Sequence, residues 1–265
     1  MTNSAAIKSI AKNLVLSVPY AKKKYLRKEF YKRSPACLGT YKTFAQALQD
    51  APPGKLIGHN HSDISEFYKL SVDNRNPADY PILFWLSRLL PETKLVFELG
   101  GSVGVGYYSF RRYIPFPPEV RWVISEVSDA VRLGREIARE RNESRLTFTV
   151  EREVEENPDI YATFGTLQYI EEPFAEIIGM LRAKPPHILL NRVPFAERET
   201  FVTLQNNGGW FSPYKIDNRA GFVKSIEALN YEVVDEWDMP RHNTFLEYTE
   251  DMVPKYHGMY FRLKG

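Results

Sequence analysis

A short and largely apolar run, Lys94–Glu98, leads straight into a cluster of glycines that ends at Gly104. Glycine permits a positive φ and lets the backbone approach a ligand closely, because it carries no Cβ. In open α/β sheets the turn between the first strand and its helix lies at the carboxyl ends of the strands, where cofactors bind. The sequence therefore predicts a strand, a turn and a helix here, with a cofactor site at the turn.

From residue 94 onward, short apolar runs alternate with segments of helical period. Strands are expected at 94–98, 121–127, 145–150, 159–164, 187–193, 231–237 and 258–263, with helices at 128–141, 172–183 and 219–229. This alternation predicts an α/β fold with a Rossmann-like, seven-stranded, doubly wound sheet whose last strand lies antiparallel at one end. Residues 1–90 are expected to form a helical, basic N-terminal extension or cap, and residues 91–265 the main domain.

Composition narrows the setting in which the chain acts. Its single cysteine, Cys37, excludes an intramolecular disulfide framework, and no apolar run approaches the ~20 residues of a membrane-spanning helix, so we expect a cytoplasmic protein. Residues 1–33 carry nine Lys and Arg against one acid, interleaved with apolar residues. They are expected to form a basic amphipathic helix that contacts an anionic membrane or a polyanionic substrate, or else a solvated arm.

The spacing of the glycines separates two classes of cofactor. Counted from Gly100, a dinucleotide fingerprint fails, because Ser102 and Val105 stand where its second and third glycines belong. The acid that closes the strand, Glu98, would also repel a pyrophosphate. Glu98 suits a positively charged amino-acid group instead, which favours S-adenosylmethionine as the cofactor.

A second acid supports this interpretation. Glu126 ends the second expected strand, where an acid in such folds accepts hydrogen bonds from the hydroxyls of an adenosine ribose. The predicted cofactor site comprises the two acids, their neighbours in the glycine turn and after the second strand, and two residues at the end of the fourth strand. These residues are Glu98, Gly100, Gly101, Gly104, Glu126, Val127, Gly165 and Thr166.

The segments FELGGSVG, VISEV, FGTLQYIEEP and ILLNRVP resemble, in order, the motifs of class I methyltransferases. Further segments, among them FWLSRLL, YYSFRRYIP, FVTLQN, SPYKIDNR and YHGMYFRL, are similar to a group of bacterial methyltransferases of surface-polysaccharide gene clusters, over about residues 60–265. This resemblance implies a Rossmann-like methyltransferase fold and S-adenosylmethionine as cofactor. The chain departs from the class at Ser102, where the middle glycine is usual, and at Glu98, where Asp is more frequent.

The expected function is in-line methyl transfer, most simply to a hydroxyl of a saccharide or small molecule. His257 is the predicted general base, and Tyr169, Asn191, Gln205 and Tyr214 are the predicted substrate-binding residues. A nucleic-acid acceptor is disfavoured, because the fourth strand is not followed by the Asp/Asn/Ser-Pro-Pro-aromatic motif, and no metal is expected. Two alternatives stay open, a non-catalytic module that binds the cofactor and an NAD-dependent oxidoreductase.

Overall fold

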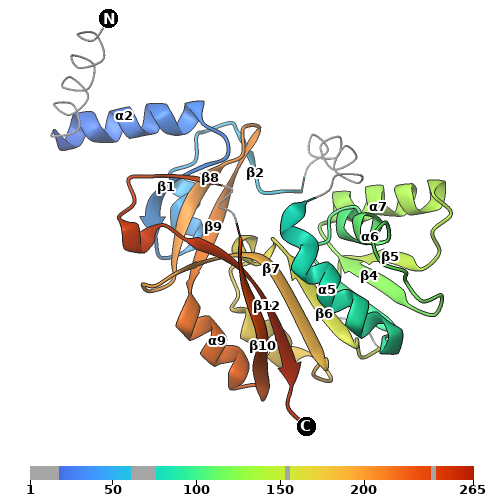
Figure 1. The fold of residues 1–265 in the computed structure, drawn as a ribbon. Coiled ribbons are helices and arrows are strands. Elements are labelled where there is room, and N and C mark those ends of the chain that lie inside the picture. Colours follow the sequence, from blue (N-terminus) through green and yellow to red (C-terminus); the bar gives the residue numbers. More distant parts are fainter. Residues whose placement is uncertain (1–17, 61–75, 153–155, 240–242) are drawn as a thin grey trace, which may run out of the picture.

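The computed structural model describes residues 18–60, 76–152, 156–239 and 243–265, and its centre is a large mixed sheet (Figure 1). The main part of this sheet has the order β5-β4-β3-β6-β7-β12-β10. The strands from β5 to β7 are parallel to their neighbours, whereas β12 is antiparallel to both β7 and β10. The bounds are β3 (Leu95–Leu99), β4 (Arg121–Ser125), β5 (Leu146–Thr149), β6 (Ile160–Phe164), β7 (His187–Ala196), β10 (Tyr231–Met239) and β12 (Lys255–Leu263).

The predicted Rossmann-like sheet is confirmed, with one correction to its order. Each expected strand forms, and the last one is antiparallel as predicted. Its predicted place at the end of the sheet is wrong, because β12 lies between β7 and β10 and forms hydrogen bonds on both edges. A strand in this position forms backbone hydrogen bonds with two neighbours instead of one. The local sequence pattern does not show which neighbours a strand has, so it could not predict this position.

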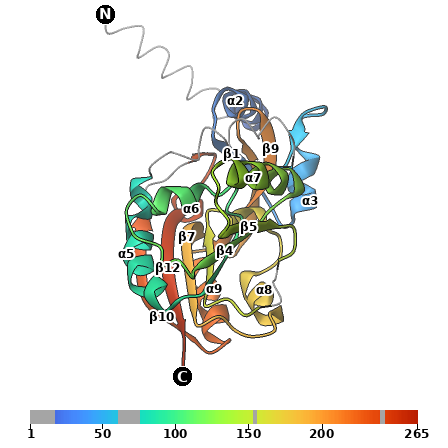
Figure 2. The same cartoon turned by 90° about the vertical axis from the view of Figure 1, so that its right-hand side faces the viewer.

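Helices cover both faces of the main sheet, and Figure 2 shows α5 and α8 on opposite sides of it. On one face pack α5 (Tyr80–Leu89), α6 (Val105–Phe110) and α7 (Ser128–Glu140); on the other pack α8 (Phe174–Met180) and α9 (Arg219–Glu227). Successive residues of a strand point to opposite faces, so Val96 joins the first core and Phe97 the second. Burial on both faces explains why the parallel strands read as nearly continuous apolar runs.

A second group of strands continues the sheet beyond β7. The hairpin of β8 (Phe201–Asn206) and β9 (Trp210–Asn218) joins the end of β7 through β9. Two strands from the first sixty residues, β1 (Ala36–Tyr41) and β2 (Leu56–Ile57), pair with β8 and β9, and β11 (Thr244–Leu246) pairs with β1. The expected division at residue 90 stays a prediction, but the expected helical extension contains these strands because partners distant in sequence stabilise them.

The helices of this second part are α2 (Pro19–Lys32) and α3 (Phe44–Gln49). Leu26 and Phe30 are buried, whereas the outer face of α2 presents Tyr20, 80% exposed, and Tyr31, 49% exposed, among basic side chains. Residues 1–17 of the expected basic helix lie outside the described residues. Short 3-10 helices complete the described elements: η1 (Pro77–Asp79), η2 (Leu90–Glu92), η3 (Leu167–Tyr169) and η4 (Glu250–Met252). Within these described parts of the chain, no helix is both long and apolar enough to cross a membrane.

Candidate functional site

The glycine turn follows β3 directly, at the carboxyl edge of the parallel strands. Gly100 and Gly104 have φ values of 76° and 95°, and Ser102 between them also has a positive φ of 54°. The Thr166 hydroxyl donates a hydrogen bond of 3.0 Å to the carbonyl oxygen of Gly100. A Cβ on Gly100 would lie 2.0 Å from that hydroxyl oxygen. Gly100 therefore lets the turn lie directly on the segment after β6, which brings the predicted residues Gly165 and Thr166 to the same edge.

Glu98 lies beneath this turn. Its side chain is buried, with 2% of the residue exposed, and its carboxylate accepts a 2.8 Å hydrogen bond from the indole N–H of Trp122. The backbone of Gly101 passes so close that a Cβ there would lie 2.7 Å from the carboxyl carbon of Glu98. Burial raises the pKa of Glu98 to about 7, although the nearby positive charge of Arg192 opposes the rise. Glu98 thus supports the turn from below, and its predicted contact with the cofactor stays a prediction.

Glu126 stands at the end of the neighbouring strand β4 and faces the turn. One carboxylate oxygen accepts a 3.1 Å hydrogen bond from the backbone N–H of Ser102, and the other accepts a 2.8 Å bond from the N–H of Val127. Burial raises the pKa of this half-buried carboxyl. The two N–H groups fix the orientation of Glu126, so the predicted pair of turn and acid is brought together.

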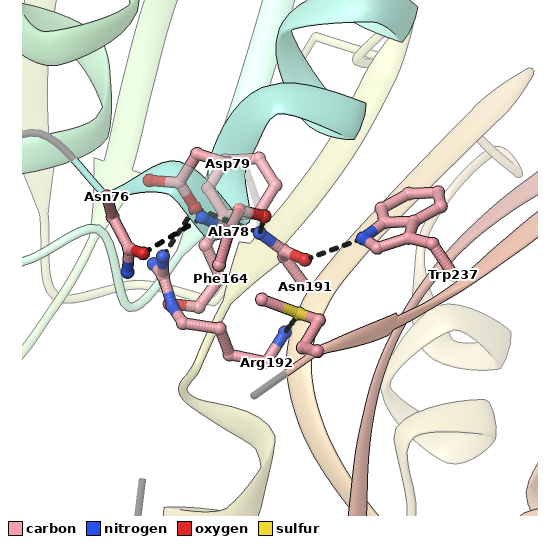
Figure 3. A network of polar contacts seen from close by, with 8 residues as sticks. Asn76, Ala78, Asp79, Phe164, Asn191, Arg192 and Trp237 are labelled. Atoms are coloured by element: carbon pink, nitrogen blue, oxygen red, sulfur yellow. Dashed lines mark hydrogen bonds and ion pairs between the residues drawn. The ribbon is translucent and has the colours of Figure 1, made fainter. Parts of the chain in front are cut away.

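A polar network surrounds the end of β6 and the middle of β7, where the pairing of these two strands stops (Figure 3). The Arg192 guanidinium forms an ion pair with Asp79 and donates a 2.9 Å hydrogen bond to the carbonyl oxygen of Phe164. The Asn191 amide donates to Asp79 at 2.9 Å and accepts a 3.0 Å hydrogen bond from the Trp237 indole N–H. Asn191 was expected near the site, whereas Asp79, Arg192 and Trp237 were missed. An arginine inside the apolar run HILLNRV was a usable signal, because charged residues are rarely buried without a partner.

Three of the predicted substrate residues meet in a second network. The Tyr169 hydroxyl donates to Gln205 at 2.9 Å, and the amide of Gln205 donates to Asn243 at 2.7 Å. Asn243 then donates to the Tyr256 hydroxyl at 2.7 Å, and this hydroxyl lies 2.8 Å from that of Tyr214. Asn243 and Tyr256 were missed by the sequence analysis. The network joins η3, just after β6, to the second group of strands.

His257, the predicted general base, lies on β12 and is buried, with 7% exposed. Its Nδ1 atom is 2.8 Å from a carboxylate oxygen of Glu236. The register of β10 and β12 puts His257 on the sheet face opposite to Trp237 and therefore to Asn191, against the core of α8 and α9. Burial lowers the pKa of His257, and Glu236 opposes the shift. Its catalytic role stays a prediction, and the structure does not bring it together with the glycine turn.

Asn60, which follows β2 in the second group of strands, contacts a helix of the main sheet. Its side-chain oxygen accepts 3.2 Å hydrogen bonds from the Ser128 hydroxyl and the Asp129 N–H, at the start of α7. The ring of the preceding residue, His59, lies edge-on to Tyr169 with centroids 4.3 Å apart. Within the described ranges, no group of three or more His, Cys, Asp or Glu side chains could hold a metal ion.

Comparison with known proteins identifies the fold. No protein-family model matches the chain, and no curated protein matches it. Among solved structures, a 1,6-didemethyltoxoflavin-N1-methyltransferase of Burkholderia thailandensis is 16% identical over 77% of this chain and 86% of its own, with a TM-score of 0.50. The N-terminal domain of EvdMO1, in the presence of SAH and D-fucose, is 12% identical over 78% and 100%, with a TM-score of 0.51.

A third similar structure is an O-methyltransferase from a trans-AT PKS multienzyme of Brevibacillus brevis in complex with S-adenosyl-L-homocysteine. It is 10% identical over 85% of this chain and 84% of its own, with a TM-score of 0.50. At these identities the likeness concerns the fold alone. The chain has a Rossmann-like methyltransferase fold, as the sequence predicts.

Proposed function

We propose that the protein is an S-adenosylmethionine-dependent methyltransferase that acts on a hydroxyl of a saccharide or small-molecule acceptor. The observation that carries this proposal is the pairing of the glycine turn with Glu126 at the carboxyl edge of a methyltransferase-type sheet. This edge is where open α/β sheets bind their ligands. The similar structures from Burkholderia thailandensis and Brevibacillus brevis both have S-adenosylhomocysteine bound, which supports the same class of cofactor here.

The residues present fit an adenosine cofactor. Each oxygen of the Glu126 carboxylate accepts one backbone hydrogen bond in the structure, and a carboxylate oxygen has a second lone pair that can accept from a ribose hydroxyl. The hydroxyl oxygen of Ser102 is buried and has no hydrogen-bond partner among the described residues. Gly100 and Gly104 let the turn adopt positive φ values and pack closely on Thr166 and Leu146, which fixes its backbone at the sheet edge.

Bound S-adenosylmethionine supplies an activated methyl group, and the chain has to align the acceptor with it. The half-buried Tyr169, held in place by Gln205, and the ring of His59 beside it form an uncharged polar and aromatic surface, a setting that suits hydroxyl groups and the apolar face of a sugar. Tyr169 lies three residues after Thr166, which contacts the glycine turn. The EvdMO1 domain, crystallised with SAH and D-fucose, supports a sugar as the acceptor class.

Calorimetry with S-adenosylhomocysteine and NAD tests the cofactor. We expect heat of binding with the former and none with NAD, and NAD binding alone would contradict the proposal. The variant Glu126→Gln keeps the size of the side chain but removes its charge, so its affinity for S-adenosylhomocysteine should fall by roughly 1–3 kcal/mol. Methyl transfer to a panel of sugars and nucleotide sugars then tests the acceptor. Cofactor binding without transfer to any acceptor would favour the non-catalytic module.

A further inference from the structure

We propose that Arg192 and Asp79 together form the receptor for the charged amino-acid end of the cofactor. In this assignment the guanidinium of Arg192 binds the α-carboxylate, and the carboxylate of Asp79 binds the α-ammonium group. The inference rests on the proposed function, and it assigns to Asp79 the contact that the sequence analysis assigned to Glu98.

The backbone conformation of Arg192 is the first observation. Arg192 has a φ of 57°, a left-handed conformation that bulky side chains rarely adopt and that is common at ligand sites. Three contacts keep it there: the ion pair with Asp79, the bond to the Phe164 carbonyl oxygen, and a backbone N–H that lies 3.2 Å from the sulfur of Met239. Arg192 lies within β7, one residue beyond the last pair between β7 and β6, and its guanidinium contacts Phe164, the last residue of β6 (Figure 3).

The space around the guanidinium is the second observation. Gly165, which follows β6 with a φ of 89°, lies against Arg192, so that a Cβ there would be 3.1 Å from Nε. Thr166, the next residue, contacts Gly100 of the glycine turn. The ion pair of Asp79 and Arg192 is therefore linked to the turn through two consecutive residues, and its side chains are 11% and 23% exposed. The two charged side chains are therefore largely buried, but each keeps an exposed part that a ligand can contact.

The charges are the third observation. The amino-acid end of the cofactor is a zwitterion, and a guanidinium beside a carboxylate is the complementary arrangement. Glu98 is a poorer partner for the ammonium group, because it is almost fully buried under the backbone of Gly101 and hydrogen-bonded to Trp122. Asp79 ends η1, directly before α5, and contacts Asn191 and Arg192 within β7.

Two ligands that differ in this group alone test the inference. S-adenosylhomocysteine carries the amino-acid end, whereas 5′-methylthioadenosine has the same adenosine and thioether without it. We expect calorimetry on the full chain to show that Arg192→Gln and Asp79→Asn each bind S-adenosylhomocysteine about tenfold or more weakly than the wild type. Their affinity for 5′-methylthioadenosine should change less than about twofold, because no charged contact to it is lost.

The matched control breaks an ion pair of the same kind elsewhere. Arg219→Gln separates a half-buried arginine from Glu236 on the α9 side, and both affinities should stay unchanged. Glu98→Gln should leave the ratio of the two affinities at its wild-type value. If Arg192→Gln does not fold, Arg192→Lys keeps the charge but loses the planar fork, and it should show a smaller loss for S-adenosylhomocysteine alone.

The outcomes distinguish the two proposals. Failure of the wild-type chain to bind S-adenosylhomocysteine would overturn the proposed function, and this inference with it. Wild-type binding of both ligands with equal affinity would leave the proposed function intact and refute the receptor. The receptor is also refuted if both variants weaken both ligands equally, since the ion pair would then act through the fold.

Discussion

Replacing Gly100 by alanine tests whether the turn requires glycine for its contact with Thr166. The new Cβ would lie 2.0 Å from the Thr166 hydroxyl oxygen and 2.2 Å from its methyl carbon, so Thr166 must move. Moving it breaks its hydrogen bond to Gly100, worth about 0.5–1.5 kcal/mol, and overpacks the site by about 1–3 kcal/mol. We expect the free energy of unfolding to fall by about 2–4 kcal/mol beyond the effect of the positive φ.

Gly54 supplies the matched control. Its φ of 72° is close to the 76° of Gly100, and nothing lies within 4 Å of the Cβ it lacks. Gly54→Ala therefore introduces the same left-handed strain, about 1–2 kcal/mol, with the same effect on the unfolded chain. Subtracting its effect from that of Gly100→Ala isolates the contact with Thr166.

Urea unfolding followed by circular dichroism measures both variants, with equal m-values as the condition for comparing them. A double variant, Gly100→Ala with Thr166→Gly, removes the obstructing side chain and should recover part of the loss as a coupling energy. If Gly100→Ala destabilises the chain by no more than Gly54→Ala, the close packing of the turn on Thr166 is refuted.

Three further predictions concern charge and burial. Because burial raises the pKa of Glu98 to about 7, the folded state binds this proton more tightly than the unfolded chain, and stability should fall by about 3 kcal/mol as the pH rises from about 4.5 to 7. Urea unfolding at pH 5 and pH 8 should show a larger fall for the wild type than for Glu98→Gln, in which other buried carboxyls such as Glu126 still titrate; an equal fall in both would contradict the assignment. The triple variant Lys23→Glu, Lys24→Glu, Lys28→Glu should sediment less with phosphatidylserine vesicles than the wild type. The free energy of membrane binding should weaken by roughly 1 kcal/mol per lysine, because these exposed cations lie on α2. Equal sedimentation of wild type and variant, with phosphatidylcholine vesicles as the control, would exclude membrane contact through α2. Tyr214→Phe should reduce the free energy of unfolding by about 1–3 kcal/mol, because a buried hydroxyl loses its partner, and an unchanged urea midpoint would refute the second network.

The main sheet was predictable because its signals are local. Val96 and Phe97 are apolar neighbours buried on opposite faces, so the run reads as a strand whatever lies beside it. The second group of strands gave no such signal. Ala36 to Tyr41 pair with β8 across more than 160 residues, and Gly39 interrupts the apolar pattern. The position of β12 was also out of reach, since it depends on which two edges remain free once the parallel strands have paired.

In the candidate site, too, contacts between residues close in sequence were predicted and contacts between distant residues were missed. Gly100, Ser102 and Glu126 were predicted because a turn and the next strand end are close in sequence and meet at one sheet edge. The ion pair of Asp79 and Arg192 spans 113 positions, and Asp79 precedes an apolar helix as an ordinary first-turn acid does. His257 was chosen for its titration near neutral pH, a property of the residue type, whereas its partners on the α9 face are set by strand register.

The segment from Thr166 to Tyr169 connects the glycine turn, which the sequence predicted, to the second group of strands, which it did not. Thr166 bonds to the glycine turn, and Tyr169, at the end of η3, bonds to Gln205 on β8. A single turn of chain therefore contacts both the proposed cofactor site and the strands that the N-terminal residues help to build. Residues 36–41 pair with β8, so the N-terminal part of the chain contributes to positioning Tyr169 although it lies far from β3 in sequence.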